Sequence, residues 1–430
     1  MVKFRKTLFF LNDTIRGSKL KTHLQDINRV LYTLTYEERK QELNKRLEKV
    51  LSHAREKVPF YVHQQGSELE SFPVVNKSII RDDLDNFVTK AIDPSSLFRV
   101  VTSGSTGTPF GVYHDASKKL RNRADTIFFG NLAGFDIGIK LNYLKIWTLV
   151  NRKSSLKSFM ENIHPIDVTQ LGDENLKVLV ETIVSNRAKQ SFLGYASALE
   201  TICNYLEEKS PSIRIPNVRS VIAMSEALSL SAKEKIYKYF GVHGVSRYSN
   251  VENGIIAQQP SDGSGYFKIN WASYHIEILD MDRDVPIEIG KVGRIVVTDL
   301  YNFAMPMIRY DTGDIGKFGW SPIGNELCLA QIEGRKMDLV YDVNGNMVSS
   351  FTITNNMWLY PEITQYQFIQ ETRESYLFKL NLKGSFDREA QLIEDFKKFF
   401  GASAIIRVDY VNEIPLLNSG KRKKVVNLNL

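Results

Sequence analysis

The residues best suited to chemistry in this sequence form one short run between Val101 and Pro109. Residues 102–108 read TSGSTGT, so every position is either glycine or a residue with a hydroxyl group. Glycine lets successive backbone N–H groups turn toward one anion, and hydroxyl groups add further donors. No lysine follows the last glycine, which separates this run from the P-loop of ATPases. The run is typical of a phosphate-binding loop, although a flexible loop often has the same composition.

Residues 246–254, SRYSNVENG, are a second candidate segment because they follow an apolar strand. Open α/β sheets bind ligands at the carboxyl ends of their strands. The ring of Tyr248 could stack on a base there, and Glu252 could reach a metal ion held by phosphates. Taken alone, the segment is also typical of an ordinary sheet edge.

Two more segments carry single candidate residues. Asp314 follows a tight glycine turn in residues 308–314, IRYDTGD, and could accept hydrogen bonds from two ribose hydroxyls. Lys421 follows a Ser-Gly turn in residues 418–424, NSGKRKK, and could stabilise charge on a transferring phosphoryl group. The alternatives are a plain turn for the first and a solvated basic tail for the second.

The elements that must position these residues alternate between helix and strand. Residues 35–58 have the spacing of a helix that Pro59 ends, and residues 176–184 form a second helical stripe. Strands are expected at residues 190–194, 218–223 and 245–248, with a helix over residues 232–240. This rhythm predicts a parallel sheet with helices on its faces.

After Gly265 the pattern changes to a period of two. Strands are expected at residues 274–279 and 293–298, which favours an antiparallel or barrel-like subdomain. The last part predicts strands at residues 365–370, 376–382 and 404–411, and a helix capped by Asp387. These elements form a small α+β module that joins the rest near residues 334–338.

Composition limits the class of protein. The chain has 430 residues, 43% hydrophobic and 24% charged, which predicts a globular protein of two or three domains. Cys203 and Cys328 are too few for a disulfide framework or a zinc site of four thiolates, so they are expected to be core thiols. The first apolar run is too short for a signal peptide and none is long enough to span a bilayer, so we expect a soluble, cytoplasmic protein.

The net charge of +7 favours anionic partners. The basic residues are scattered among acidic ones, and no nucleic-acid recognition motif appears, so we expect no nucleic-acid partner. The excess of positive charge instead favours anionic substrates or peripheral association with a membrane surface.

Taken together, five motifs resemble those of a known enzyme family. In chain order they are VTSGSTGTP, YSNVE, IRYDTGD, GRKMD and NSGK, supported by KVPFY, FPVVNK and FLGYAS. The chain resembles the adenylate-forming acyl-ligase superfamily from about residue 40 to its end. Within it, the sequence is most similar to the phenylacetate–CoA ligase-like group and its capsule-polysaccharide CapK branch.

The resemblance implies an α/β, multi-domain fold. Residues 1–334 would form a large N-terminal domain with parallel sheets and a barrel-like β subdomain, and residues 335–430 a small, mobile α+β domain that carries the catalytic lysine. It also implies a reaction in which a carboxylate attacks the α-phosphate of ATP, giving an acyl-adenylate and pyrophosphate.

The resemblance assigns roles to individual residues. Lys421 would bridge the carboxylate and the α-phosphate, and Glu252 would help to hold Mg²⁺. The remaining nucleotide-binding residues would be Ser103, Gly104, Ser105, Thr106, Gly107 and Thr108 at the phosphates, Tyr248 and Ser249 with Ser225, Glu226 and Ala227 around adenine, and Asp314 and Arg335 at the ribose. The acyl pocket would be lined by Trp147, Tyr195 and Ser197.

Four departures from the family pattern bear on activity. Phe110 stands where many relatives have a lysine after the phosphate loop, and Val251 replaces the threonine before the metal-binding glutamate. Met337 replaces the usual hinge Asp or Lys. The cysteine cluster that binds zinc in some phenylacetate-type ligases has no counterpart, so no zinc is expected.

The leading hypothesis is an ATP- and Mg²⁺-dependent ligase that activates a small carboxylic or amino acid. Transfer to an amino group of a nucleotide sugar, in surface-polysaccharide assembly, is preferred over transfer to CoA, which is the alternative acceptor. A further alternative is a nucleotide-binding subunit without turnover, which Val251 and Met337 motivate. A nucleic-acid or anionic-membrane binder is the third.

Overall fold

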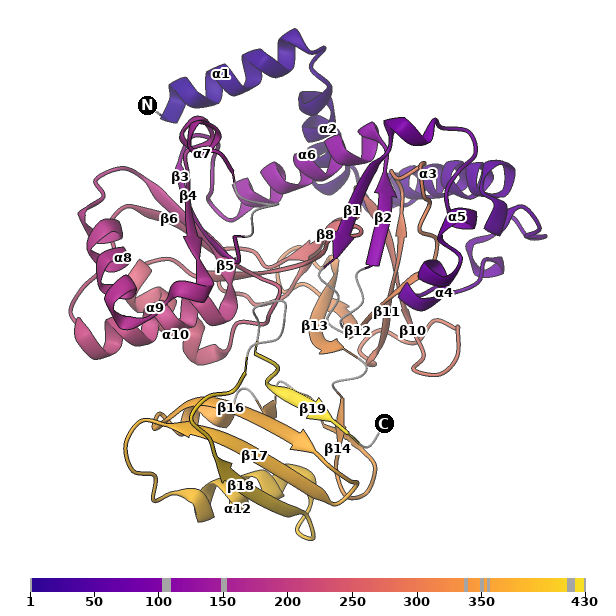
Figure 1. Ribbon diagram of the computed structural model, residues 1–430. Helices are drawn as coiled ribbons and strands as arrows, with labels where there is room; N and C mark the ends of the chain where they lie inside the picture. Colours follow the sequence, from indigo (N-terminus) through magenta and orange to yellow (C-terminus); the bar gives the residue numbers. More distant parts are fainter. Residues whose placement is uncertain are drawn as a thin grey trace.

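The computed structural model describes residues 2–102, 110–147, 153–335, 339–348, 352–353, 356–415 and 422–428. Figure 1 shows a large N-terminal part made of two sheets with helices around them. A small C-terminal domain lies below it, with its sheet toward the larger part and its helix on the far side.

A mainly parallel sheet forms the first half of the large part. Within the described residues its strands, in order across the sheet, are β4 (Ile163–Asp167), β3 (Lys140–Lys145), β5 (Gln190–Tyr195), β6 (Val218–Met224), β7 (Gly244–Asn250), β8 (Gly254–Gln258) and β9 (Lys268–Ile269). The strands are parallel from β4 to β7, and β8 and β9 are antiparallel additions. The predicted parallel sheet is confirmed.

Helices cover both faces of this sheet. One face packs on α8 (Asp173–Ser185), α9 (Ala196–Lys209) and α10 (Leu230–Phe240). Phe192 and Val221 point to that face, whereas Leu193 and Ile222 pack on the opposite one with Ala133, which follows α6 (Ala116–Leu132). This alternation along each strand is why the sheet residues are apolar at successive positions.

An antiparallel sheet forms the other half of the large part. Its strands are β10 (Tyr274–Leu279), β11 (Gly293–Asp299), β12 (Tyr310–Trp320) and β13 (Leu327–Arg335), paired in chain order. It is flanked by the hairpin of β1 (Phe98–Thr102) and β2 (Phe110–His114) and by α3 (Tyr36–Lys57), α4 (Lys77–Asp82) and α5 (Leu84–Phe87). The expected helix at residues 35–58 is confirmed, and a capping box between Thr35 and Glu38 begins it.

Short single-turn helices connect these elements. They are η2 (Pro59–Tyr61), η3 (Leu69–Ser71), η4 (Pro94–Ser96), η5 (Val168–Gln170) and, in the C-terminal domain, η7 (Met357–Leu359).

The C-terminal domain has its own aromatic core. Its sheet has the order β18 (Ile405–Tyr410), β17 (Ser375–Leu382), β16 (Ile363–Gln370) and β19 (Val425–Asn427), beside the small hairpin of β14 (Val340–Tyr341) and β15 (Met347–Val348). Phe368 stacks on Phe400 of α12 (Glu389–Phe400) at 4.9 Å between ring centroids. The strands and helix agree with expectation, but Asp387 is not the cap, because the residue before α12 is Arg388 and its side chain makes no capping bond. The boundary between residues 334 and 335 stays a prediction.

Three helical segments at the N-terminus were not predicted from the sequence. They are α1 (Val2–Ile15), α2 (Lys19–Asn28) and the π-helix η1 (Arg29–Thr33), and α2 packs along α6. No helix in the described part of the chain is long and apolar enough to cross a membrane. Both cysteines are buried, as expected, and burial raises the pKa of the Cys203 thiol to about 12.

Buried charges fasten α2 to the rest of the large part. The two carboxylate oxygens of Asp26 each lie 2.7 Å from an arginine, Arg46 of α3 and Arg121 of α6. Arg121 is fully buried and also donates to the carbonyl of Ala272 at 2.7 Å. Burial opposes ionisation of Asp26, but hydrogen bonds from Arg46 and the charge of Arg121 outweigh it and hold the pKa of Asp26 well below its ordinary value.

We expect Asp26→Asn to destabilise the fold by about 3 kcal/mol at neutral pH, because it removes the principal counter-charge of a buried arginine. The pKa of Asp26 is lower in the folded chain than in the unfolded one. The contribution of Asp26 to the free energy of unfolding is therefore fully present above its pKa in the unfolded chain, about 4, and is lost as the pH falls below that value. Urea unfolding at neutral and acidic pH measures both effects. The control Asp82→Asn, at a side chain 73% exposed, should shift stability by less than about 0.5 kcal/mol.

Candidate active site at the carboxyl ends of the parallel strands

Four neighbouring parallel strands end at predicted site residues. β3, β5, β6 and β7 lie side by side in the sheet, so their carboxyl ends form one edge. The residues at or just after these ends are Trp147, then Tyr195 and Ser197, then Ser225, Glu226 and Ala227, and finally Tyr248 and Ser249. The structure thus brings together the expected substrate residues and the expected adenine residues, at the edge where α/β sheets bind ligands.

The turn after β6 is held to the start of α9. Ser225 has a φ of 69°, a left-handed conformation that is unfavourable for serine. The Glu226 carboxylate accepts a hydrogen bond of 2.9 Å from the backbone N–H of Ser197, in the first turn of α9. A carboxylate at a helix N-terminus is electrostatically favourable, so this contact holds the turn expected to bind adenine against Ser197, which is expected to line the acyl pocket.

Two aromatic rings and one lysine lie in contact at the carboxyl end of β3. The Trp147 indole N–H donates to the carbonyl of Tyr143 at 3.2 Å, and their rings meet edge to face. The Lys145 ammonium lies 4.3 Å from the centre of the Trp147 ring. Burial, together with the charge of Lys153, lowers the pKa of Lys145. Sequence reasoning missed Lys145, which carries no motif and is recognisable only by its place at this strand end.

Asp314 reaches the site because β12 bulges. The register of β12 against β11 shifts around residues 312–314, where Gly313 has a φ of 78°. The Tyr248 hydroxyl donates to Asp314 Oδ2 at 2.8 Å. Burial and the Asp314 charge raise the pKa of Tyr248 well above its ordinary value, so the phenol stays protonated and keeps donating. The predicted adenine and ribose residues are therefore in direct contact.

Glu252 is a buried carboxylate with a cation beside it. Its side chain is 1% exposed, and its Oε1 lies 2.7 Å from the ammonium of Lys77 on α4. The Tyr310 hydroxyl donates to the same oxygen at 2.8 Å, and His114 Nε2 donates to the backbone carbonyl of Glu252 at 2.7 Å. Lys77 is a second residue that sequence reasoning missed, although it lies in the quoted segment FPVVNK.

The C-terminal domain contacts α9, whose first turn lies at this edge of the sheet. Lys424 of that domain lies 3.5 Å from Glu200 on α9, and Lys383 forms an ion pair with Glu208 at the other end of α9. Burial disfavours the charge on Lys424, but Glu200, Tyr366 and Glu226 favour it and raise its pKa. The residues that follow Lys421 in the chain therefore lie close to the Glu226 turn.

Several predicted residues lie outside the part of the chain that the structure describes. They are Lys421, Met337 and the phosphate-loop residues Ser103, Gly104, Ser105, Thr106, Gly107 and Thr108. For Arg335 only the backbone is described, and it pairs with Asp314 between β13 and β12. Among the described residues, no group of three or more His, Cys, Asp or Glu side chains could hold a metal ion.

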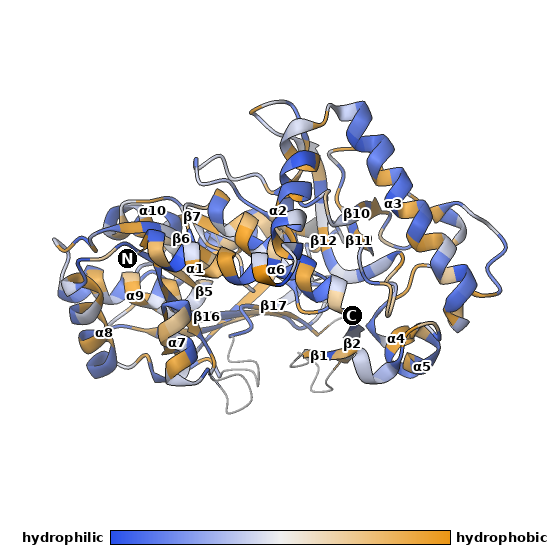
Figure 2. Ribbon diagram, turned by 90° about the horizontal axis from the view of Figure 1, so that it is seen from above, coloured by the Kyte–Doolittle hydropathy of each residue, from blue (hydrophilic) through white to orange (hydrophobic). Residues whose placement is uncertain are grey.

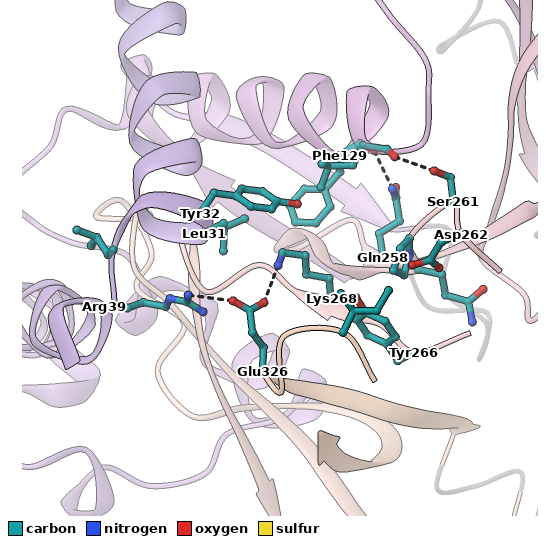
Figure 3. A pocket seen from close by; sticks show the side chains of 15 residues that line it. Leu31, Tyr32, Arg39, Phe129, Gln258, Ser261, Asp262, Tyr266, Lys268 and Glu326 are labelled. Atoms are coloured by element: carbon teal, nitrogen blue, oxygen red, sulfur yellow. Dashed lines mark hydrogen bonds and ion pairs between the residues drawn. The ribbon is translucent and has the colours of Figure 1, made fainter. Parts of the chain in front are cut away.

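A separate pocket of about 450 Å³ lies away from this edge, between η1, the end of α6 and β9. Figure 3 shows that Glu326 bridges Arg39 and Lys268 there, at 3.1 and 2.7 Å. None of the predicted site residues lines this pocket. Because its cations already share a carboxylate, we do not count it as part of the candidate active site.

Comparison with known proteins identifies the fold. Residues 340–428 match the family model of the CapK C-terminal domain. CapK of Staphylococcus aureus is 21% identical over 375 residues, which cover 84% of this chain and 80% of CapK. A phenylacetate–coenzyme A ligase of Thermus thermophilus is 22% identical over 374 residues and 82% of each chain. The structure of 2-hydroxyisobutyryl-CoA ligase in its postadenylation state, in complex with R3-HIB-AMP, aligns with 93% of this chain and 91% of that chain at 17% identity and a TM-score of 0.70.

The chain is thus similar to adenylate-forming ligases along most of its length, and its C-terminal domain to that of CapK. This confirms the resemblance carried by the five motifs, the α/β multi-domain fold class and the assignment to the AMP-forming ligases. The same 2-hydroxyisobutyryl-CoA ligase in its thioesterification state also aligns with 93% of the chain, but with a TM-score of 0.56. The arrangement of the two parts seen here is thus more similar to that of the postadenylation state.

We expect Asp314→Asn to weaken the binding of ATP and AMP by about tenfold to a hundredfold. The substitution keeps an acceptor for Tyr248 but removes the charge that strengthens hydrogen bonds from ribose hydroxyls. Isothermal titration calorimetry on both proteins measures the change. The exposed control Asp409→Asn should bind like the wild type, and unaltered affinity in Asp314→Asn would remove Asp314 from the nucleotide site.

Proposed function

We propose that this chain is an ATP-dependent ligase that activates a small carboxylic or amino acid as its acyl-adenylate. One observation carries the proposal: the Tyr248–Asp314 pair, the Glu226 turn and buried Glu252 all lie around the carboxyl ends of the same parallel strands. They come from segments far apart in the sequence. A mononucleotide is the ligand whose base, ribose and phosphates match these three groups.

The proposed reaction has a simple atom balance. A carboxylate oxygen of the acid bonds to the α-phosphorus of ATP, and the bond from that phosphorus to the bridging oxygen breaks. Pyrophosphate leaves with the electron pair, and no proton is transferred. Tyr248 and the turn of Ser225, Glu226 and Ala227 would hold adenine, and Asp314 the ribose, so that the α-phosphate is fixed in front of the acid.

The residues fit a magnesium ion bound with the nucleotide. Mg²⁺ in nucleotide sites is usually held by one or two carboxylates together with the phosphates. Glu252 offers one buried carboxylate, kept in place by the Tyr310 hydroxyl, and would be the protein ligand. When bound, the ion would offset phosphate charge and favour departure of pyrophosphate.

Many relatives have a lysine at the position of Phe110. Lys77 is proposed to supply the positive charge at the phosphates that Phe110 cannot supply. Its ammonium contacts Glu252 at 2.7 Å and lies 5.9 Å from the centre of the Phe110 ring. Phe110 directly follows the expected phosphate loop. Lys77, from α4, therefore places a positive charge close to the position of the lysine found in many relatives. Its side chain is 40% exposed, which leaves it able to turn toward a phosphate.

The acid would lie beside Trp147, Tyr195 and Ser197. Lys145 at this edge supplies positive charge that favours a carboxylate, and the aromatic rings favour a small apolar or aromatic body. We propose transfer of the acyl or aminoacyl group to an amino group in surface-polysaccharide assembly. The CapK-type C-terminal domain and the match to CapK over 84% of the chain support this acceptor. CoA is the second candidate, supported by relatives that are CoA ligases.

Lys421 is proposed as the catalytic lysine, with the junction near Arg335 as the hinge. The support is the NSGK motif and the contact of the neighbouring Lys424 with α9. A lysine there would stabilise the charge that develops on the α-phosphate as the acid attacks.

The proposal predicts acid-dependent exchange of labelled pyrophosphate into ATP, screened over carboxylic and amino acids. Lys421→Ala should lower the exchange rate by about 10²–10³-fold with ATP affinity nearly unchanged. Lys423→Ala, two positions away, is the matched control and should retain activity. Mass spectrometry of products formed with CoA or with amino sugars separates the acceptors. Absence of exchange with every acid would favour a nucleotide-binding subunit without turnover.

A second test concerns Lys77. We expect Lys77→Ala to lower kcat/KM for pyrophosphate exchange by about 10²-fold, because it removes a charge near the phosphates. Lys77→Arg should recover part of this loss. Arg81→Ala, one turn further along α4, should behave as the wild type. Equal kinetics of the Lys77→Ala and Arg81→Ala enzymes would rule the role out.

A further inference from the structure

The N-terminal helix α1 carries an apolar stripe that points away from the protein. Its members are Phe4, Leu8, Leu11 and Ile15, which are 65%, 49%, 52% and 77% exposed. Their spacing of four, three and four residues places all of them on one side of a helix. Large apolar side chains that gather in this way on a surface mark an interaction site more often than scattered ones do.

The inner side of α1 is already bound to the protein. Lys6 forms an ion pair with Asp136 at 2.8 Å. Buried Asp13 accepts hydrogen bonds from the backbone N–H groups of Leu20 and Lys21 at the start of α2, at 3.1 and 2.9 Å. Phe9 packs on the core between α2 and α6. These contacts fix the orientation of α1 and leave the stripe facing outward.

A second helix extends the apolar surface. On α7 (Ser155–Glu161), Leu156, Phe159 and Met160 are 70%, 71% and 69% exposed. The guanidinium of Arg5 lies 5.4 Å from the centre of the Phe159 ring and joins the two helices. Both helices lie at the end of the molecule opposite the C-terminal domain, and they stay close to each other in both views (Figures 1 and 2). We call these seven apolar residues of α1 and α7 the α1–α7 surface.

Positive charge surrounds the α1–α7 surface. On a helix of 3.6 residues per turn, Lys3 and Arg5 lie about 100° to either side of Phe4. Arg16, Lys19 and Lys157 are exposed nearby. On α1 the single acidic residue, Asp13, is buried, and on α7 Glu161 is paired with Lys153. An apolar stripe between basic flanks is the pattern of helices that lie in the interface of a membrane.

We propose that the α1–α7 surface docks this protein onto a membrane rich in anionic lipids. Phe4, Leu8, Phe159 and their neighbours would enter the headgroup region, and the basic flanks would contact lipid phosphates. A second copy of the chain fits this surface less well, because its equally basic rim would repel. The candidate active site faces the C-terminal domain, so docking leaves it open.

Sedimentation with lipid vesicles tests the proposal on the full chain. The protein should pellet with phosphatidylcholine vesicles that contain phosphatidylglycerol, and much less with phosphatidylcholine alone. The double variant Leu8→Glu/Leu11→Glu should reduce binding about tenfold or more. The matched control Val178→Glu/Leu230→Glu adds the same charge at side chains 60% and 54% exposed on α8 and α10 and should bind like the wild type.

Three outcomes would overturn the proposal. They are no pelleting of the wild type with phosphatidylglycerol, equal pelleting of the two double variants, and a dimer in analytical ultracentrifugation that Leu8→Glu/Leu11→Glu dissociates. Circular dichroism checks that the variants fold. If the Leu8→Glu/Leu11→Glu protein is unfolded, Lys3→Glu/Arg16→Glu decides the question, because it keeps the apolar stripe and should lose the preference for anionic vesicles.

Discussion

Two tyrosine–carboxylate hydrogen bonds hold the candidate site together. Tyr248 at the end of β7 donates to Asp314 in the bulge of β12, and Tyr310 at the start of β12 donates to Glu252 after β7. Each bond joins the parallel sheet to the antiparallel one. Tyr310 is fully buried and Tyr248 is partly buried. Burial and the neighbouring carboxylates raise the pKa values of both tyrosines, so both phenols remain hydrogen-bond donors. A shared apolar core, which includes Ile256 and Ile269 of the parallel sheet with Ile276 and Leu329 of the antiparallel one, packs the two sheets together. The two tyrosine–carboxylate bonds add directional contacts at the candidate site, where the shape of a nucleotide site would be set.

The same constraint explains the use of irregular backbone at the site. A regular β12 strand would send side chains alternately to its two faces, and Asp314 reaches Tyr248 where the register shifts. Ser225 likewise adopts a left-handed conformation so that Glu226 can meet the N–H of Ser197. Such conformations are costly, and they persist here at contacts between elements that come from different parts of the chain.

Much of this arrangement could be read from the sequence because it depends on local periodicity. The strand Tyr274–Leu279 was expected at its observed bounds, and α3 follows from its helical spacing and the capping residues Thr35 and Glu38. The parallel sheet with helices on its faces follows from the alternation of helix and strand, whereas the order of its strands was not predicted. The site residues at the strand ends were predicted by their motifs, and the structure brings Tyr248 and Asp314 into contact.

What could not be predicted depends on tertiary contacts or on weak local signals. Lys77 meets Glu252 across 175 positions of sequence, and nothing in either segment indicates that pairing. The helix α1 was not predicted, because the first residues are basic and then briefly apolar, a pattern that was compared with a signal peptide and not with an amphipathic helix. Asp387 has the residue type of a helix cap, but α12 begins one residue too late for it. Helix ends are set by small free-energy differences, so tertiary packing readily moves them by a residue or two.

Among the described residues, the ion pairs between the two parts of the chain are weaker than the packing within each part. The ion pairs of Lys424 with Glu200 and of Lys383 with Glu208 involve side chains that are 30–59% exposed, and such pairs contribute about 0–1 kcal/mol each. The C-terminal domain is held together internally by buried rings such as Phe368, Phe378 and Phe396. Its core would therefore survive a rotation that breaks these ion pairs. That difference in strength permits a rigid-body movement of the domain that leaves its core intact.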